Sequence, residues 1–453
     1  MKKDVLGGNY HPFWEGFPLT DIHLCIAPDV LHQLYQGVLK YLVVWVQRII
    51  GQDELDDRIR KLPPSPGVRH FAKGISNLAQ VSGSEQKHIA RILLCCIVGK
   101  VDARGITACR SILHFIQLAQ YPSHDEDTLN YMQQELDTWH KYRDYFITQG
   151  SRQHFNIPKF HSLLHYIDSI RWIGTTDNSN TEAFERLHID FAKEGWRASN
   201  KRDHFPQMVT FISRQEKVTS VAKNPSEPRK KLSAITLLHG APGFEGALKL
   251  FLNDYLPKSE QRKKQRALEG IIPFLTLEVW HNFGLVPAKV LDDPEKARIK
   301  ARPRSSKLGN SARFDTVLVL EKDDAESTAV LGEVVARLRV IFRLPSEVYN
   351  NGRHKNAPAN WPKEHLAYIT WYTRFKSSPD SSTGMYKVEP ALDSNGMPQG
   401  AIIPLSNIRQ SCMLVPSTKT SWDKHWNSDN ILDECSSFFV NNLQTKYTYQ
   451  TIY

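Results

Sequence analysis

Apolar side chains recur at intervals of three and four residues directly after Pro28, which is the pattern of an amphipathic helix. These positions are Val30, Leu31, Leu34, Tyr35, Val38, Leu39 and Leu42. Proline suits the first turn of a helix and glycine often follows its end, so the pattern predicts a helix over residues 28–50 that stops at Gly51. A short apolar run at residues 22–26 predicts a strand just before it. Asp29 would then stand where a strand passes into a helix.

Residues 52–150 predict an all-α module. A connection broken by Pro, Gly and Ser comes first, and three helical patterns follow, near residues 86–101, at residues 106–119 and after residue 125. The last pattern is the most regular and runs through Leu129, Met132, Leu136, Trp139 and Phe146. Ser123 and Glu126 have the spacing of its capping box. This seam is therefore expected to be core.

The remaining chain predicts helices first and strands afterwards. In residues 151–223, Pro158 opens one helix, TTDNSN forms a turn, and a long helix begins near Thr181. Residues 224–312 read as mixed helices with basic linkers at both ends. Residues 313–453 contain β-branched and aromatic runs bounded by turn residues, which predict a small all-β domain. Those runs are RFDTVLVL, VVARLRVIFRLP, LAYITWYTRF, GMYKVEP and GAIIPL.

Composition narrows the classes of partner and compartment. The 453 residues carry a formal net charge of +10, which favours a polyanionic partner such as nucleic acid, although a merely basic soluble protein has the same charge. Six cysteines form no CxxC pair, and Cys95, Cys96 and Cys109 fall on apolar helical faces, so they read as buried thiols in a reducing compartment. No signal peptide and no membrane-length apolar run is found in the sequence, so no membrane partner is expected.

Two acidic positions suggest metal chemistry when they are taken together. Asp29 is followed, much later, by Glu182 and Glu185 one helical turn apart, and by His188. Ribonuclease H-like nucleases hold divalent metals with a strand-end aspartate and a helix glutamate, and two-metal phosphoryl transfer needs such hard oxygen ligands. We therefore predict that Asp29 and Glu185 approach each other, with residues 1–51 and 151–223 forming a core and residues 52–150 an insertion. Each acid alone is equally ordinary at a helix start or on a solvated helix surface.

Two further groups of side chains leave alternatives open. His161 and His165 are spaced i, i+4, which suits either a zinc-binding face or polar packing. Downstream of Glu185 the basic residues suit a DNA backbone and a solvated helix face equally well. They are Lys193, Arg197, Lys201 and Arg202. The sequence has no P-loop, no GxSxG and no dinucleotide fingerprint.

Several motifs together resemble a fungal Plavaka transposase, of the Kyakuja–Dileera–Zisupton group that is related to the CACTA class. They are FWEGFP, PDVLHQLYQGVLKYLVVW, KFHSLLHY and TTDNSNTEAFERLHIDFAKEGWRASNKRDHFPQM, with ARFDTVLVL, RLRVIFRLP, LAYITWYTRF and IIPLSNIRQSCMLVP later in the chain. The resemblance implies a ribonuclease H-like domain with an Asp-Asp-Glu triad and Mg²⁺ or Mn²⁺, which cuts and joins DNA at transposon ends. By position, Asp29 resembles the second catalytic Asp, with His32 in its DxxH motif. Glu185 resembles the third acid, with Glu182 the second choice.

The resemblance also implies a catalytic Asp upstream of Asp29, on the first strand of the core. Asp4 and Asp21 have no strand context to replace it, so we expect the C-terminal part of a transposase that is catalytically incomplete. The predicted fold is α+β and multidomain: a partial ribonuclease H-like core with a large all-α insertion, then an all-β domain. The expected partner is double-stranded DNA in the nucleus, and a homo-oligomer is also considered. The alternatives are a non-catalytic DNA- or chromatin-binding remnant and a helical scaffold without activity.

Overall fold

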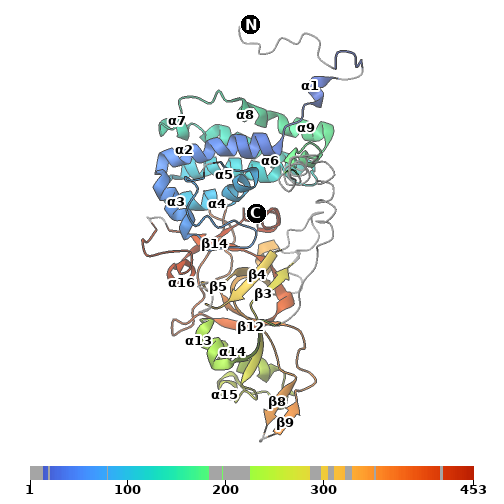
Figure 1. Cartoon of the computed structure of the whole chain (residues 1–453), viewed down its shortest axis with the longest axis vertical. Coiled ribbons are helices and arrows are strands. Elements are labelled where there is room, and N and C mark those ends of the chain that lie inside the picture. The colour runs from blue at the N-terminus through green and yellow to red at the C-terminus, as the bar shows by residue number, and fades with distance from the viewer. Residues whose placement is uncertain are drawn as a thin grey trace.

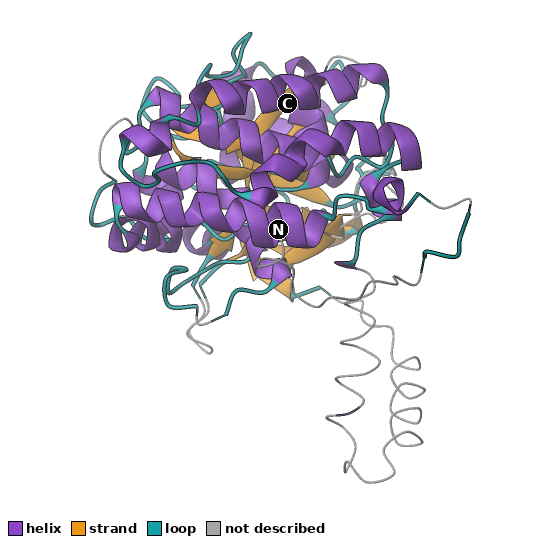
Figure 2. Cartoon of the chain, turned by 90° about the horizontal axis from the view of Figure 1, so that it is seen from above, coloured by secondary structure: helices purple, strands orange, loops and turns teal. Residues whose placement is uncertain are grey.

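The computed structural model of the chain describes residues 14–18, 21–78, 80–182, 196, 225–285, 297–304, 311–321, 329–350, 353–418 and 422–452. The helices of the first half of the chain gather at one end of the molecule, and the sheets lie towards the other end with a few further helices (Figure 1). Seen from above, the helices lie side by side over the strands (Figure 2). The predicted α+β class is therefore confirmed.

The helical body is formed by the first half of the chain. Its elements are α1 (Ile22–Cys25), η1 (Val30–Leu39), α2 (Lys40–Ile50), α3 (Gln52–Lys61), α4 (Gly83–Ile97), α5 (Ala103–Leu118), α6 (Glu126–Tyr142), α7 (Tyr145–Thr148), α8 (Pro158–His161), η2 (Ser162–His165), α9 (Tyr166–Ile173) and η3 (Thr176–Asn178). η1 is a π-helix that continues directly into α2. The helices expected in residues 52–150 are present, and Pro158 opens α8 as predicted.

An aromatic cluster joins the helices of this body. Trp45 of α2 stacks on Trp139 of α6 with ring centroids 6.4 Å apart, and on Phe160 of α8 at 5.3 Å. Phe146 of α7 also contacts Trp45, at 5.1 Å. The predicted seam of α6 is buried, and the thiols of Cys95, Cys96 and Cys109 are buried as expected. Large aromatic side chains give much of the hydrophobic stabilisation in such a core.

Capping residues set several of the helix boundaries. Gly51 ends α2 with a φ of 89°, a left-handed conformation that glycine adopts without strain. The predicted capping box of Ser123 and Glu126 is wrong, because α6 begins at Glu126 and the box is made by Asp125 and Thr128. Both pairs have the required spacing, and the helix starts two residues later than the sequence pattern suggested.

The strand predicted at residues 22–26 is also wrong. Residues Ile22–Cys25 form the short helix α1, and Leu24 and Ile26 expose 52% and 67% of their surface. A β-strand needs a neighbouring strand for its backbone groups, and none pairs with this segment in the described part of the chain. Asp29 therefore follows an extended connection and not a strand.

The second half of the chain supplies the strands. They are β1 (Glu227–Lys231), β2 (Thr276–Trp280), β3 (Asn282–Leu285), β4 (Ala297–Arg302), β5 (Arg313–Phe314), β6 (Thr316–Leu320), β7 (Glu333–Arg343), β8 (Glu347–Asn350), β9 (Arg353–Asn356), β10 (Leu366–Trp371), β11 (Lys387–Val388), β12 (Gly400–Pro404), β13 (Ile408–Ser411), β14 (Met413–Pro416) and β15 (Phe438–Asn441). Helical segments lie between them: α13 (Leu232–Leu238), α14 (Phe244–Asp254), α15 (Lys264–Leu268), η6 (Ala329–Gly332), η7 (Leu405–Asn407), α16 (Ile431–Glu434) and α17 (Lys446–Ile452).

The largest sheet is antiparallel, in the order β1-β2-β7-β10-β12, and β6 joins β7 to β13. Its central strand β7 is buried along almost its whole length. The basic stretches predicted as linkers contain strands, since residues 227–231 form β1 and residues 297–302 form β4. The segment 224–312 is thus part of the sheet region as well as helical.

The C-terminal strands share one hydrophobic core with the helices. Buried side chains of β11, β14, β15 and α17 belong to the same cluster as those of α2 to α9. Hydrogen bonds reinforce this contact: Asn441 donates to the carbonyl of Arg91 at 2.8 Å, and Gln444 donates to the carbonyl of Pro66 at 2.8 Å. The β character of residues 313–453 agrees with the expectation, while the boundary between helical and β domains stays a prediction.

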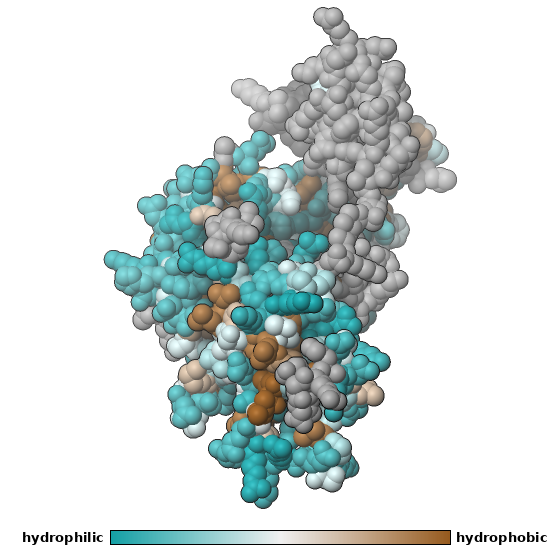
Figure 3. Space-filling model, turned by 60° about the horizontal axis from the view of Figure 1, so that its bottom comes forward, coloured by the Kyte–Doolittle hydropathy of each residue, from teal (hydrophilic) through white to brown (hydrophobic). Residues whose placement is uncertain are grey.

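The surface is mostly hydrophilic, with some apolar areas on the face shown in Figure 3. The most exposed large hydrophobic side chains of the sheet half are Leu237, Ile271 and Leu275, which expose 79%, 95% and 82% of their surface. Within the described ranges, no helix has the length and apolar character that crossing a membrane requires.

Candidate functional site

Asp29 lies directly before η1 and caps it. Its backbone is extended, with φ −103° and ψ 126°, and its Oδ2 atom accepts a hydrogen bond from the backbone N–H of His32 at 2.6 Å. The His32 Nδ1 atom lies 2.7 Å from the same oxygen. Acidic residues are favoured at this position because their side-chain oxygens satisfy the unpaired N–H groups of the first turn. The DxxH spacing thus allows Asp29 and His32 to form two hydrogen bonds within the first helical turn.

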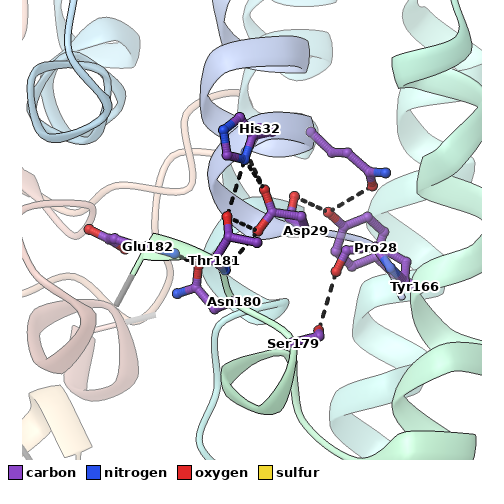
Figure 4. A network of polar contacts seen from close by, with 9 residues as sticks. Pro28, Asp29, His32, Tyr166, Ser179, Asn180, Thr181 and Glu182 are labelled. Carbon is purple, nitrogen blue, oxygen red and sulfur yellow. Dashed lines mark hydrogen bonds and ion pairs between the residues drawn. The ribbon is translucent and has the colours of Figure 1, made fainter. Parts of the chain in front are cut away.

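The second oxygen of Asp29 binds a residue far away in the sequence. Oδ1 accepts a hydrogen bond from the backbone N–H of Thr181 at 3.1 Å and another from the Thr181 hydroxyl at 3.0 Å (Figure 4). Thr181 also places its Oγ1 atom 3.2 Å from His32 Nδ1. Thr181, the first residue of the TEAFER motif, is therefore hydrogen-bonded to Asp29 of the PDVLH motif.

The ionisation of Asp29 follows from these contacts. Burial alone would raise the pKa of its carboxyl group, but the hydrogen bonds from His32 and Thr181 together outweigh burial and hold the pKa below its usual value. Its side chain is 15% exposed, whereas that of His32 is 43% exposed, so the pair opens to solvent on the histidine side. Asp29 is a carboxylate at neutral pH.

Two hydroxyl groups fix the backbone around Asp29. The Tyr166 hydroxyl of α9 donates to the carbonyl oxygen of Asp29 at 3.1 Å, and the Ser179 hydroxyl donates to that of Pro28 at 3.4 Å. Burial, and then the nearby Asp29 charge, raise the pKa of Tyr166, which keeps it a donor. The first and the last part of the helical sequence, residues 28–29 and 166–179, therefore meet at the start of η1.

Glu182 follows Thr181 but does not join the Asp29 network. Its carboxylate pairs with Lys87 of α4, and Figure 4 shows its side chain directed away from Asp29. Lys87 also lies 5.5 Å from the centre of the Tyr35 ring. Glu182 is therefore one partner of a partly exposed ion pair.

The comparison with protein families decides what this segment resembles. Residues 1–46 match the Plavaka transposase family. The matched segment includes Asp29 and His32, and it supports a Plavaka-type transposase, as the sequence motifs predicted. No curated protein and no solved structure gives a significant match to the chain.

Most of the other candidate site residues predicted from the sequence lie outside the described residues. They are Glu185, His188, Lys193, Arg197, Lys201 and Arg202. The approach of Asp29 to Glu185 therefore stays a prediction, and so does the DNA-binding role of the basic residues. Thr181, the first residue of the TEAFER motif that contains Glu185, is the residue that contacts Asp29.

Two residues of this site, Thr181 and Lys87, were not among those predicted from the sequence. Thr181 could have been found, because it begins the TEAFER motif and can cap a helix. Lys87 carries no such signal, since only the packing of α4 beside η1 brings it to Glu182. His161 and His165, the remaining candidates, lie on the solvent side of α8 and η2.

The described residues near Asp29 do not fit a divalent metal ion as they stand. A carboxylate has about four lone-pair sites, and Asp29 uses four hydrogen bonds, two on each oxygen. The nearby acid, Glu182, is paired with Lys87. Throughout the ranges that the structure describes, no three His, Cys, Asp or Glu side chains are grouped so that they could hold a metal.

Proposed function

We propose that the chain is a transposase-derived protein whose parent enzyme performs metal-dependent cleavage and strand transfer on double-stranded DNA at transposon ends. The observation that carries this proposal is the family match over residues 1–46, which includes Asp29. The contact between Asp29 and Thr181 adds support, because it brings the two acid-bearing motifs of the resemblance together. The net charge of +10 suits a DNA partner.

We further propose that the arrangement seen around Asp29 is catalytically incomplete. Its carboxylate oxygens serve the fold through His32 and Thr181, and Mg²⁺ or Mn²⁺ would have to replace those hydrogen bonds. A ribonuclease H-like core belongs to the proposal and rests on the family resemblance, since the described residues around Asp29 are helical. No catalytic step is assigned to this arrangement.

The second candidate is a DNA- or chromatin-binding protein without cleavage activity. The saturated Asp29 carboxylate favours it, because hydrogen bonds of this kind stabilise a fold without any metal. Nuclear residence is part of both proposals. The basic stretch at residues 229–231 supports it, and expression of a fluorescent fusion would test it.

Incubation of the full chain with supercoiled DNA separates these functions. Nicking that requires Mg²⁺ or Mn²⁺, disappears in Asp29→Asn and persists in the exposed control Asp168→Asn would show that the chain keeps the activity proposed for its parent, and it would contradict the proposed catalytic incompleteness. Binding without cleavage that weakens with salt, by a log–log slope of about −0.9 per phosphate contacted, and is unchanged by Asp29→Asn would support the second. Absence of DNA binding at low salt would refute both.

A further inference from the structure

His161 and His165 face each other on the outside of the helical body. Their Nε2 atoms are 3.4 Å apart, their ring centroids are 5.0 Å apart and their ring planes are inclined by 80°. His161 ends α8 and His165 ends η2, so consecutive helical segments present both rings on one side. The apolar neighbours Phe160 and Leu163 are buried beneath them.

The distance between the two nitrogens matches a tetrahedral metal ion. Zinc binds histidine nitrogen at about 2.0–2.1 Å in tetrahedral geometry, which places two ligand nitrogens about 3.3–3.4 Å apart. A right angle between ligands, as in square-planar or octahedral sites, would bring the nitrogens to about 2.9 Å at the same bond length. The observed 3.4 Å fits the tetrahedral case better than the right-angled one.

We propose that His161 and His165 bind a zinc-like divalent cation through their Nε2 atoms. Among the described residues each of these nitrogens has the other as its hydrogen-bond partner, and an ion bound between the rings would replace that one contact. Both side chains are exposed, which gives the ion a direct route from solvent. Imidazole nitrogen prefers Zn²⁺ to Mg²⁺, so this site differs in chemistry from a carboxylate site at Asp29.

The site has two protein ligands and two open positions. The described residues offer no group of three ligating side chains, so water completes the coordination. Such a site holds metal less tightly than a four-ligand structural site, and its affinity depends on both rings acting together. The inference does not rest on the proposed action on DNA.

Titration of the metal-free full chain with ZnCl₂ by calorimetry tests the site, and Co²⁺ absorption reports its geometry. We expect His165→Gln to weaken Zn²⁺ binding at one site per chain by about 100-fold, the gain that a second linked ligand can supply. His161→Gln should do the same. His425→Gln, which changes an exposed histidine elsewhere, should leave the binding unchanged.

Three outcomes would overturn the proposal. One is equal binding of Zn²⁺ by the wild type and by both pair variants, which would place the ion elsewhere. Another is the absence of saturable binding in the wild type, which would make the pair a hydrogen-bonded contact only. The third is a Co²⁺ spectrum without tetrahedral character. Because both rings are exposed, circular dichroism without metal should show that the variants keep the fold.

Discussion

Replacement of Asp29 by alanine should destabilise the helical body by about 3 kcal/mol. Loss of an acidic N-cap costs about 1 kcal/mol, and here the lost contact is that of Oδ2 with the His32 N–H at 2.6 Å. Hydrogen bonds to a charged group contribute about 1.5–3 kcal/mol. The two donors of Thr181 share one oxygen, so together they should contribute about 2 kcal/mol.

The contribution of Asp29 should also depend on pH with a definite sign. Its pKa in the folded chain lies below the ordinary value of 3.8, so the unfolded chain binds the proton more readily. The stabilisation is therefore fully present above that ordinary value and disappears as the pH falls through the lower folded pKa. In Asp29→Ala this part of the acid dependence should be missing.

Urea unfolding followed by circular dichroism at 222 nm measures both effects. A double-mutant cycle with Thr181→Val isolates the part of the long-range contact that the Thr181 hydroxyl makes, because valine keeps the backbone N–H. We expect a coupling free energy of about 1–2 kcal/mol between Asp29 and Thr181. Asp168→Ala, an exposed acid on α9, should change stability by less than about 0.5 kcal/mol. A loss below about 1 kcal/mol in Asp29→Ala, or additive single substitutions, would refute the reasoning.

Four further substitutions test the packing and the electrostatics. Trp139→Ala should cost about 3–5 kcal/mol in urea unfolding, because the ring is fully buried, and a loss below about 1 kcal/mol would contradict its place in the core. Gly105→Ala should destabilise by about 1–3 kcal/mol despite alanine's helix propensity, since the new Cβ would lie 2.4 Å from the Tyr145 ring; Gly246→Ala, with 3.5 Å of space, should be neutral or gain up to about 1 kcal/mol. Burial lowers the pKa of His239 to about 4, so stability should fall as the pH drops from 6.5 towards that value, and His239→Gln should remove this slope in urea midpoints measured against pH.

The helical half of the fold could be predicted because burial follows a periodic pattern there. Leu34, Leu136 and Trp139 lie on the apolar faces that the sequence indicated, and all three are buried. Gly51 and Pro158 mark helix boundaries for local steric reasons that need no tertiary information. Local signals were therefore sufficient where neighbouring residues determine the structure.

The errors have the opposite origin, since they depend on partners elsewhere in the chain. Residues 22–26 look like a strand, yet a strand exists only with a neighbour to pair with. Residues 227–231 look like a charged linker, yet they form the edge strand β1 because β2 lies beside them. Charged residues are common on edge strands, where one face and one edge meet solvent.

The candidate site shows the same division. The hydrogen bonds between Asp29 and His32 follow from the DxxH spacing, because the two residues share the first helical turn. The bond to Thr181 instead joins residues that are 152 positions apart in the sequence. Sequence motifs marked both segments as important without showing how they meet. The pairing of Glu182 with Lys87 depends on the position of α4 and has no local signal at all.

The two oxygens of Asp29 can serve the fold or a metal ion, but not both at the same time. Each oxygen already accepts two hydrogen bonds, and a bound divalent ion would take at least one of the positions that Thr181 or His32 occupies. The contacts with Thr181 and with the His32 ring could be exchanged without breaking the helix cap, which is the bond from the His32 N–H. Activity in this chain would therefore require Thr181 or the His32 ring to move away from Asp29, and a protein that only binds DNA would keep both contacts intact.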